Sequence, residues 1–285
     1  MTDLAVQRRF YAEEIQIAAN IRSPRIIEAL ASVPRERFLP PGPWTIRSDG
    51  DFGAPPRQTP DADPRYVYHN IAIAIDHARM LFNGMPGLIC MAMDALGIGA
   101  GARVLHVGTG TGYFTALMGH CTEATGRVVG VEVDEPLAAQ AKANLASMPW
   151  IEMRHGDATA ALNESFDAIL VNAGVTHPLD TWLDAVPGGG KIVFPLTAAI
   201  APMGNIGKGL MLLLTKTPSP DAFDVRVLTF VAIFSAVALR DDGLNTEIGK
   251  ALSKHPFPPL KRLRRDGHEK SDSCWMHAAS FCLGM

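Results

Sequence analysis

Short apolar runs alternate with amphipathic stretches through the middle of the chain. The runs over residues 103–107, 127–133 and 166–171 are too short, and too rich in β-branched residues, to be helices, so they predict buried parallel strands. Residues 86–96 and 134–145 instead carry apolar positions at helical spacing. Strands that alternate with helices predict an α/β domain built on a parallel sheet.

The regions on either side have different patterns. Residues 5–31 have helical spacing interrupted by Ser23-Pro24, which we expect to be a helix N-cap and a first-turn proline. Residues 41–66 are rich in proline and lack periodicity, so they predict an irregular connection. Residues 209–215 and 225–235 predict two strands at an antiparallel edge. We expect three parts: an N-terminal helical extension with an irregular flap (1–75), a core (76–240) and a C-terminal extension (241–285).

A glycine-rich turn follows the first of these apolar runs. Residues 108–112 read Gly-Thr-Gly-Thr-Gly, and Tyr113 then opens a predicted helix. Alternate glycines let a ligand approach the backbone, and the N–H groups at a helix start favour an anionic group, as in nucleotide-type cofactor sites. A dinucleotide fingerprint needs a third glycine where Tyr113 stands, and the phosphate-binding G-x-x-x-x-G-K-[ST] sequence is absent. A glycine-rich turn without a ligand fits the same residues.

Polar residues follow the predicted strands, where ligands bind in open α/β sheets. Glu132 lies near the end of the second strand, about 20 residues after the glycine-rich turn, where a carboxylate accepts hydrogen bonds from ribose hydroxyls. At a strand tip, its removal is expected to have little effect on folding. Asn172 and His177 follow the run 166–171, and we expect both to face the reacting group. A surface charge is the simpler alternative for Glu132.

Composition narrows the class of protein. The chain has 285 residues, 47% of them apolar, and a net charge of −3, which gives no general attraction to nucleic acid or to a membrane. Four scattered cysteines, with neither a signal segment nor a spanning run, favour a reducing compartment, so we expect a cytoplasmic protein. No Cys/His spacing predicts a metal, and no G-x-S-x-G predicts a serine hydrolase. The basic run 261–265 fits a solvated face, or a contact with an acidic or nucleic-acid partner.

The chain resembles a known enzyme family at several places. The segment 21–40, IRSPRIIEALASVPRERFLP, is similar to the I-x-S-P-R-V-I-E-A and V-P-R-E-x-F-V-P sequences of protein-L-isoaspartate O-methyltransferases. The turn resembles the G-x-G-x-G motif of S-adenosylmethionine-dependent methyltransferases in general. Similarities at 103–116, 127–145 and 166–195 extend the resemblance to about residues 10–235. It implies an α/β fold with a doubly wound, seven-stranded Rossmann-like methyltransferase sheet and N-terminal helical and C-terminal extensions.

The resemblance also implies S-adenosylmethionine as the cofactor and S-adenosylhomocysteine as its product. Asp157 matches the acid of the family's G-D-G/A turn, which accepts a hydrogen bond from the adenine amino group, although a helix N-cap fits it too. His106 stands where relatives carry an acid that supports the cofactor's amino group; a neutral imidazole accepts one hydrogen bond there, and a core histidine also fits. The residues expected at the cofactor are His106, Gly108, Thr109, Gly110, Gly112, Tyr113, Glu132, Val133, Asp157, Ala158 and Asn172.

The acceptor side departs from the family pattern. Relatives carry a G-Q-T-I-S-A-P-H stretch whose hydroxyls help to hold the substrate carboxylate. Aligning Pro86 with the motif proline puts Phe82 at the threonine, Asn83 at the isoleucine and Gly84 at the serine. Asn83 offers an amide donor and Gly84 a backbone N–H, although a tight turn accounts for the same pair. We expect Asn83, Gly84 and His177 at the acceptor.

These residues favour O-methylation of a carboxylate on a protein or peptide. A carboxylate is ionised at neutral pH and needs no general base, which fits the lack of a catalytic dyad, whereas amine or phenol methylation needs a base such as His177. Two other classes fit the same residues: a methyltransferase for a different small-molecule or peptide acceptor, and a non-catalytic binder of S-adenosylmethionine or S-adenosylhomocysteine. Tyr113 opposes an oxidoreductase.

Overall fold

The computed structural model describes residues 3–48, 54–159, 162–199, 205–219 and 221–285. The chain forms two compact units, each made of two separate segments. The first unit comprises Met1–Ala102 and Thr109–Gly156, and the second comprises Arg103–Gly108 and Asp157–Met285. The chain therefore passes from one unit to the other within the glycine-rich turn.

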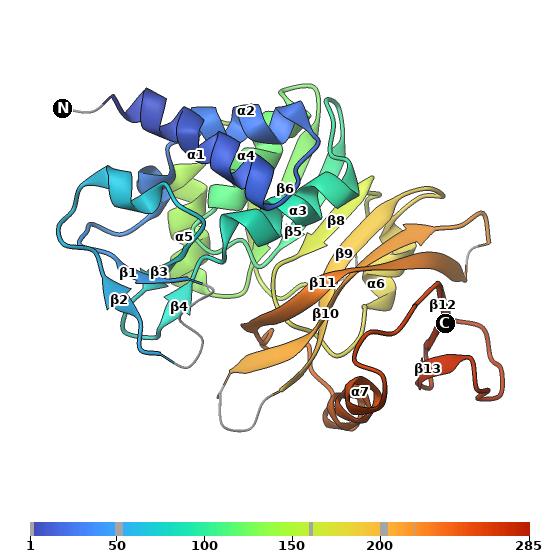
Figure 1. Cartoon of the computed structure of the whole chain (residues 1–285). Coiled ribbons are helices and arrows are strands. Elements are labelled where there is room, and N and C mark those ends of the chain that lie inside the picture. The colour runs from blue at the N-terminus through green and yellow to red at the C-terminus, as the bar shows by residue number, and fades with distance from the viewer. Residues whose placement is uncertain (1–2, 49–53, 160–161, 200–204, 220) are drawn as a thin grey trace. The chain divides into compact units, whose positions relative to one another are not determined.

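Helices make up most of the first unit. Their bounds are α1 Leu4–Ala18, α2 Pro24–Ser32, α3 Pro86–Leu96, α4 Tyr113–Thr122 and α5 Glu135–Asn144, with short 3-10 helices η1 at Arg35–Phe38 and η3 at Pro64–Val67. α1 and α2 pack side by side (Figure 1) and bury Ile15 and Leu30. Pro24 starts α2 as expected, but the Ser23 hydroxyl makes no capping hydrogen bond. No helix in the described ranges of the chain is long and apolar enough to cross a membrane.

A small antiparallel sheet lies where the sequence predicts an irregular connection. Its strand order is β2-β1-β3-β4, with bounds Arg57–Gln58, Thr45–Arg47, Ala72–Asp76 and Leu81–Phe82. The expectation for residues 41–66 is therefore wrong over β1 and β2. Strands of two or three residues are too short to show an alternating pattern, and the prolines around them obscure it further.

The first unit also holds a parallel strand pair. β6 (Arg127–Glu132) pairs with β7 (Ile151–His155), and Glu132 lies opposite His155 at the end of the ladder. β6 is buried over nearly its whole length, as its apolar sequence predicts. Asp134 then caps α5, because its carboxylate accepts a hydrogen bond from the Leu137 N–H at 3.1 Å. This strand, acidic end and capped helix confirm the order read from the sequence.

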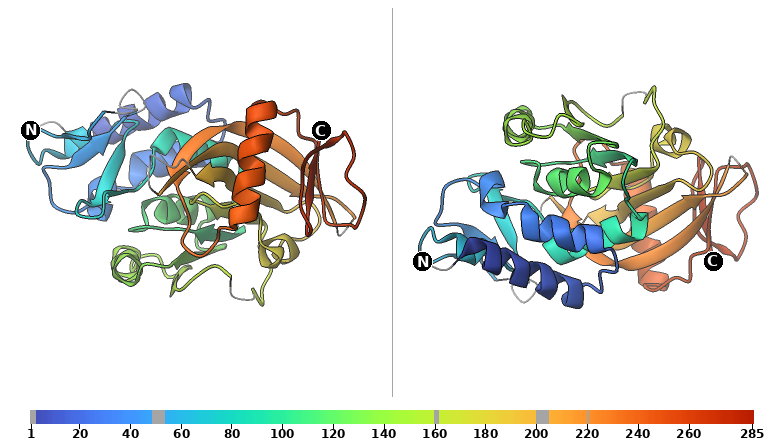
Figure 2. Two further views of the ribbon diagram at one scale, coloured as in Figure 1. Left: turned by 90° about the horizontal axis from the view of Figure 1, so that it is seen from below. Right: turned by 90° about the horizontal axis from the view of Figure 1, so that it is seen from above.

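The second unit is built on one mixed sheet. Its strands follow the order β5-β8-β9-β10-β11-β12-β14-β13. β5 (Arg103–Val107), β8 (Ala168–Val171) and β9 (Lys191–Ala199) run parallel, while β10 (Ile206–Lys216) and β11 (Ala222–Phe234) form the expected antiparallel pair. The unit also contains α6 (Asp180–Ala185) and α7 (Asp242–Lys254), and α7 lies across the long strands (Figure 2).

The C-terminal extension adds strands that the sequence does not predict. The seven expected strands are present as β5 to β11, but β12 (Arg262–Arg264), β14 (Cys282–Gly284) and β13 (Cys274–His277) continue the sheet beyond β11. The expected count of seven is therefore too low. Strands of three or four residues carry too little pattern to be predicted from sequence. The division of the chain into extension, core and extension stays a prediction.

The basic run at 261–265 is paired with carboxylates of this chain. Arg265 lies 2.8 Å from Asp184 and 3.5 Å from both Asp180 and Asp221, and only 15% of its side chain is exposed. Arg264 donates to the Asp266 carboxylate at 2.8 Å. These ion pairs hold β12 and the nearby turns together, so much of the run's charge is used inside the unit.

Candidate active site

The buried carboxylate of Glu132 joins the glycine-rich turn to the end of β6. Its Oε2 accepts a hydrogen bond from the Gly110 N–H at 2.7 Å, and its Oε1 accepts one from the Asp134 N–H at 3.2 Å. Glu132 is 7% exposed, so a surface charge does not describe it, and the expectation that its loss hardly affects folding does not fit this burial. Burial raises the pKa of Glu132, while the two N–H donors oppose this shift. Each oxygen keeps a lone pair for a further donor.

Glycine is required in the turn by both backbone conformation and space. Gly110 has a φ of +54°, and a Cβ built there lies 3.0 Å from Ile75 Cδ1. Gly112 precedes α4 with a φ of +94°, and its Cβ would lie 2.9 Å from Leu145 Cδ1. The turn is also tied to α5, because Asn144 Nδ2 donates to the Thr111 carbonyl at 2.9 Å. Its shape is thus fixed by packing within the first unit.

The other first-unit residues expected at a cofactor differ in what they expose. Val133 is 42% exposed directly after Glu132, whereas Thr109 is buried. The Tyr113 ring points into the core, where its hydroxyl lies 3.4 Å from the Tyr11 hydroxyl. Only the backbone N–H of Tyr113 is therefore suited to contact a cofactor. Because Tyr113 is the first residue of α4, this N–H has no hydrogen-bond partner within the helix.

In the second unit, the ends of β5 and β8 bring Gly108 and Asn172 together. The Asn172 N–H donates to the Val107 carbonyl at 2.8 Å, and its Nδ2 donates to the Gly108 carbonyl at 3.5 Å. The carboxyl ends of neighbouring parallel strands are the usual ligand position in such sheets. His106 is fully buried within β5, and burial lowers its pKa to about 3, so its imidazole is neutral at physiological pH.

Asp157 and Ala158 form a local turn after the first unit's last strand. Asp157 is exposed, and its Oδ1 accepts from the Thr159 N–H at 3.0 Å and from the Thr159 hydroxyl. This Asx turn holds the carboxylate near the backbone. Ala158 is buried, and its carbonyl accepts from Trp182 Nε1 at 3.1 Å, which anchors the turn to α6.

The loop after β8 is held by residues that the sequence did not single out. Arg240 donates to the Gly174 carbonyl at 3.1 Å and to the Thr197 carbonyl at 2.9 Å. The Asp241 N–H donates to Thr176 Oγ1 at 2.9 Å, and this hydroxyl lies 3.0 Å from His177 Nδ1. A hydroxyl has one proton and two lone pairs, so besides accepting from Asp241 it can either donate to Nδ1 or accept from it, according to the imidazole tautomer. Burial lowers the pKa of His177, although Asp241 and Asp180 oppose this.

A buried arginine holds Asn83, one of the residues expected at the methyl acceptor. Arg35, which is 0% exposed, donates to the carbonyls of Val67 at 2.8 Å and Ile71 at 2.7 Å. Asn83 Oδ1 lies 3.4 Å from Arg35 Nη2 and accepts from the Ile73 N–H at 3.1 Å. The sequence contained Arg35 within the V-P-R-E step but gave no sign that its guanidinium is buried.

Gly84 follows Asn83 with a left-handed backbone. Its φ is +81°, although a Cβ there would meet nothing nearer than 3.6 Å. A serine, which the family pattern has at this position, would be strained by the backbone rather than by lack of space. Phe82 lies in β4, with the guanidinium carbon of Arg47 5.5 Å from its ring centroid.

These features define a class of protein. A glycine-rich turn between strand and helix, an acidic residue at the end of the next strand and polar residues after the following strands are typical of an α/β S-adenosylmethionine-dependent methyltransferase. The family model for protein-L-isoaspartate(D-aspartate) O-methyltransferase (PCMT) matches residues 56–208. The chain belongs to this family, whose members are S-adenosylmethionine-dependent O-methyltransferases.

Similar proteins support the assignment over most of the chain. Protein-L-isoaspartate O-methyltransferase 2 of Anaeromyxobacter sp. (strain Fw109-5) is 31% identical over 216 residues, which cover 74% of this chain and 76% of that protein. The enzyme of Synechococcus sp. (strain JA-2-3B'a(2-13)) is 29% identical, with 75% and 79% covered. One solved protein-L-isoaspartate O-methyltransferase shares the fold with a TM-score of 0.64 at 21% identity, covering 89% of this chain and 72% of that one.

A second structure extends the likeness in fold. It is a Plasmodium falciparum protein described as a protein-L-isoaspartate O-methyltransferase in complex with S-adenosyl-L-homocysteine. Its TM-score is 0.60 at 16% identity, and the match covers 80% of this chain and 97% of that chain. The α/β methyltransferase fold expected from the sequence is thereby confirmed, although not its strand count.

Proposed function

We propose that this chain methylates a carboxylate oxygen on a protein or peptide, and that Asn83 donates a hydrogen bond to that carboxylate. The orientation of the Asn83 amide carries the proposal. Two donors, the Ile73 N–H and Arg35 Nη2, meet its Oδ1, so Nδ2 is the group that faces the other way. Among the described residues this buried Nδ2 has no hydrogen-bond partner. An unpartnered buried donor costs about 1–3 kcal/mol, which favours a ligand that brings an oxygen.

The chemistry asks little of the protein beyond binding and orientation. Bound S-adenosylmethionine supplies a methyl group already activated by its sulfonium. Transfer of this methyl to an ionised acceptor carboxylate would form a C–O bond as the C–S bond breaks, and its electron pair would remain on the sulfur of S-adenosylhomocysteine. No proton is transferred, because a carboxylate with a pKa near 4 is already ionised. The work of the chain is to orient the two groups and to exclude water.

His177 is suited to orient such an acceptor. In the proposed arrangement the Thr176 hydroxyl donates its proton to His177 Nδ1, so the imidazole proton lies on Nε2 and the neutral ring presents a donor rather than a base. A neutral donor is what a carboxylate needs, whereas an amine or phenol acceptor needs a basic nitrogen. We infer that His177 Nε2 is a donor of the second unit that suits a carboxylate acceptor.

The cofactor roles follow from the groups that each residue presents. Glu132 offers its remaining lone pairs to the ribose hydroxyls, and Asp157 offers its carboxylate to the adenine amino group. Val133 presents apolar surface, and the backbone at Gly108, Gly110 and Gly112 presents N–H and C=O groups. His106, neutral and buried, is suited to a structural role as well as to a single hydrogen bond.

Replacing Glu132 is expected to weaken cofactor binding and to lower stability. Glu132→Ala removes charge-assisted hydrogen bonds worth about 1.5–3 kcal/mol in all, so the Kd for S-adenosylhomocysteine rises about 10–150-fold. Stability falls too, because the Gly110 and Asp134 N–H groups lose their acceptor. Isothermal titration calorimetry and thermal unfolding measure the two effects.

Glu135→Ala is the matched control, since Glu135 is exposed in the same helix-strand region and touches neither N–H. This variant should bind S-adenosylhomocysteine with the wild-type Kd. In a separate titration, NAD should not bind the wild-type chain. A folded Glu132→Ala variant with the wild-type Kd would remove Glu132 from the cofactor site.

The proposed function is tested by methyl transfer and by an isosteric change at Asn83. Tritiated S-adenosylmethionine and mixed protein or peptide substrates should give base-labile methyl esters that release tritiated methanol. Asn83→Asp keeps an oxygen for Ile73 and Arg35 but replaces the Nδ2 donor with an acceptor, so kcat/KM for the acceptor should fall about 10–150-fold. The Kd for S-adenosylhomocysteine should not change.

Asn70→Asp is a matched control, because Asn70 also uses its Oδ1 for a backbone N–H, that of Gly87 at 2.8 Å. It should retain full activity. Base-stable methylation, or S-adenosylhomocysteine binding without any methyl transfer, would overturn the carboxylate assignment in favour of another acceptor or of a non-catalytic binder.

A further inference from the structure

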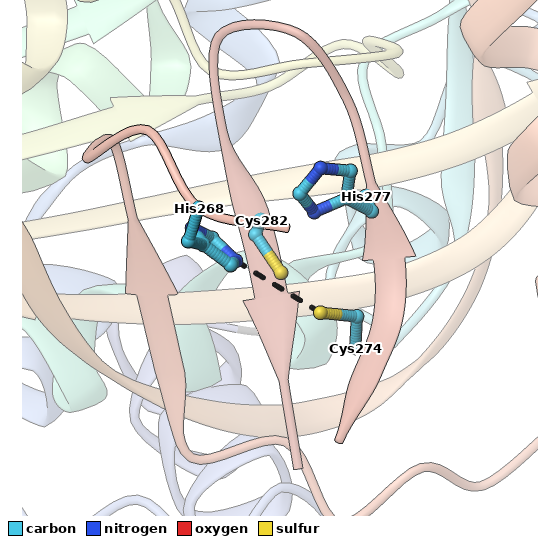
Figure 3. Close-up of side chains that lie close together, drawn as sticks. All are labelled: His268, Cys274, His277 and Cys282. Carbon is cyan, nitrogen blue, oxygen red and sulfur yellow. Dashed lines mark hydrogen bonds between the residues drawn. The ribbon is translucent and has the colours of Figure 1, made fainter. Parts of the chain in front are cut away.

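Two histidines and two cysteines of the C-terminal extension come together at its three short strands. His268 follows β12, Cys274 and His277 lie at the two ends of β13, and Cys282 begins β14. Figure 3 shows the four side chains turned toward one another. One ligand atom from each residue lies within 4.8 Å of all the others. His277 and Cys282 are opposite each other in the β13–β14 ladder, so strand pairing itself holds half of the cluster.

The spacing of these atoms is close to that of a tetrahedral zinc site. Zinc binds thiolate sulfur at about 2.3 Å and imidazole nitrogen at about 2.0–2.1 Å, which sets its ligand atoms roughly 3.3–3.8 Å apart. Cys274 Sγ lies 3.9 Å from His268 Nε2, and the widest pair in the cluster is within 4.8 Å. Closing around an ion therefore needs side-chain shifts of about 1 Å or less.

Hydrogen bonds around the cluster leave lone pairs on nitrogen and sulfur that can bind a metal. His268 Nδ1 lies 2.9 Å from the Asp266 carbonyl, which only accepts, so Nδ1 carries the proton and the Nε2 lone pair faces Cys274. Such a carbonyl partner is the usual support of a metal-bound histidine. The Ser271 N–H donates to Cys274 Sγ at 3.4 Å. His277 Nδ1 is buried and has no hydrogen-bond partner in the described part of the chain.

We propose that His268, Cys274, His277 and Cys282 bind one zinc ion. Sulfur and nitrogen donors without a carboxylate favour zinc over calcium or magnesium. Four protein ligands complete a tetrahedron and leave no position for substrate, so the site is structural. The ion holds β12, β13 and β14 together. Each of these strands has only three or four residues and is barely stable without further support.

The sequence expectation of no metal site rested on spacing. The pattern is H-x5-C-x2-H-x4-C, which matches no common zinc signature, and the cysteines are scattered when counted along the whole chain. The strand pairing of β13 with β14 brings the last two ligands together, and this pairing was not predictable from the sequence.

Metal content of the full-length chain tests the proposal directly. Protein purified under reducing conditions from zinc-supplemented cells should contain one zinc ion per chain by mass spectrometry of the metal. Cobalt exchanged into the site should show the absorption of tetrahedral cobalt with thiolate ligands. Cys274→Ser and Cys282→Ser should each lose the bound zinc. Removing zinc from the wild-type chain should speed hydrogen exchange over residues 262–284 while leaving exchange in α4 unchanged.

His255→Ala is the control, because His255 is an exposed histidine of the same extension and only its backbone carbonyl contacts Trp275. It should keep the full zinc content. If the cysteine variants do not fold, the cobalt spectrum of the wild-type chain decides alone. Three results would overturn the proposal. The first is a reduced chain that takes up no stoichiometric zinc, and the second is copper or iron bound instead of zinc. A Cys274–Cys282 disulfide in the purified protein is the third.

Discussion

Isoaspartyl peptides are expected to be poor methyl acceptors for this chain, with kcat/KM about two to four decades below the level usual in its family. Phe82 and Gly84 stand where the family sequence presents two hydroxyls to the substrate carboxylate. Each charge-assisted hydrogen bond lost is worth about 1.5–3 kcal/mol, and each 1.36 kcal/mol is about one decade in rate. We expect Asn83 Nδ2 to recover part of this loss and the acceptor to be a different carboxylate.

The assay compares tritiated methyl transfer to an isoaspartyl peptide with transfer to its aspartyl twin, read as base-labile ester. Phe82→Thr restores one hydroxyl in β4, where the backbone is extended, and should raise isoaspartyl kcat/KM about 10-fold or more. Gly84→Ser is a poor choice, because the φ of +81° strains any side chain there. Turnover of the isoaspartyl peptide at a rate typical of the family would show that the hydroxyls are dispensable, without affecting the assignment of a carboxylate acceptor.

The strands and the glycine-rich turn were predictable because their signals are local. An apolar run such as Val128 to Val131 needs burial on both faces wherever it lies, and Gly112 needs its φ of +94° whatever surrounds it. The acidic end at Glu132 was predictable for the same reason, since it is the last residue of its strand. Its hydrogen bond to Gly110 was not, because that contact joins residues 22 positions apart.

The supports of the candidate site depend on contacts between distant segments. Arg35 reaches carbonyls 32 to 36 positions away, and Arg240 reaches Gly174, 66 positions away. An arginine in a sequence is most often exposed, so nothing in the local pattern marks Arg35 as buried or Arg240 as half-buried. The same limit hides the Cys/His cluster, whose ligands meet only through the pairing of strands too short to be predicted.

Loss of the Arg35 guanidinium should destabilise the chain by about 3–5 kcal/mol. The side chain is fully buried, and it donates to the carbonyls of Val67, His69 and Ile71 as well as to Asn83 Oδ1. Arg35→Ala removes the donor to the buried carbonyls of Val67 and Ile71 and opens a cavity, and both are among the few causes of large single-residue effects. Chemical denaturation should show a lower midpoint, and hydrogen exchange should be faster over residues 67–83.

Two further variants separate the guanidinium from a general effect of charge in η1. Arg35→Lys keeps the charge but not the planar fork that reaches several carbonyls, so its stability should lie between those of Arg35→Ala and the wild type. Arg37→Ala, two residues away and exposed, should change stability by less than about 0.5 kcal/mol. Because Arg35 also orients Asn83, Arg35→Lys should lower acceptor kcat/KM while leaving the Kd for S-adenosylhomocysteine near its wild-type value. Equal midpoints for Arg35→Ala and Arg37→Ala would mean that the buried network does not hold the 67–83 segment in place.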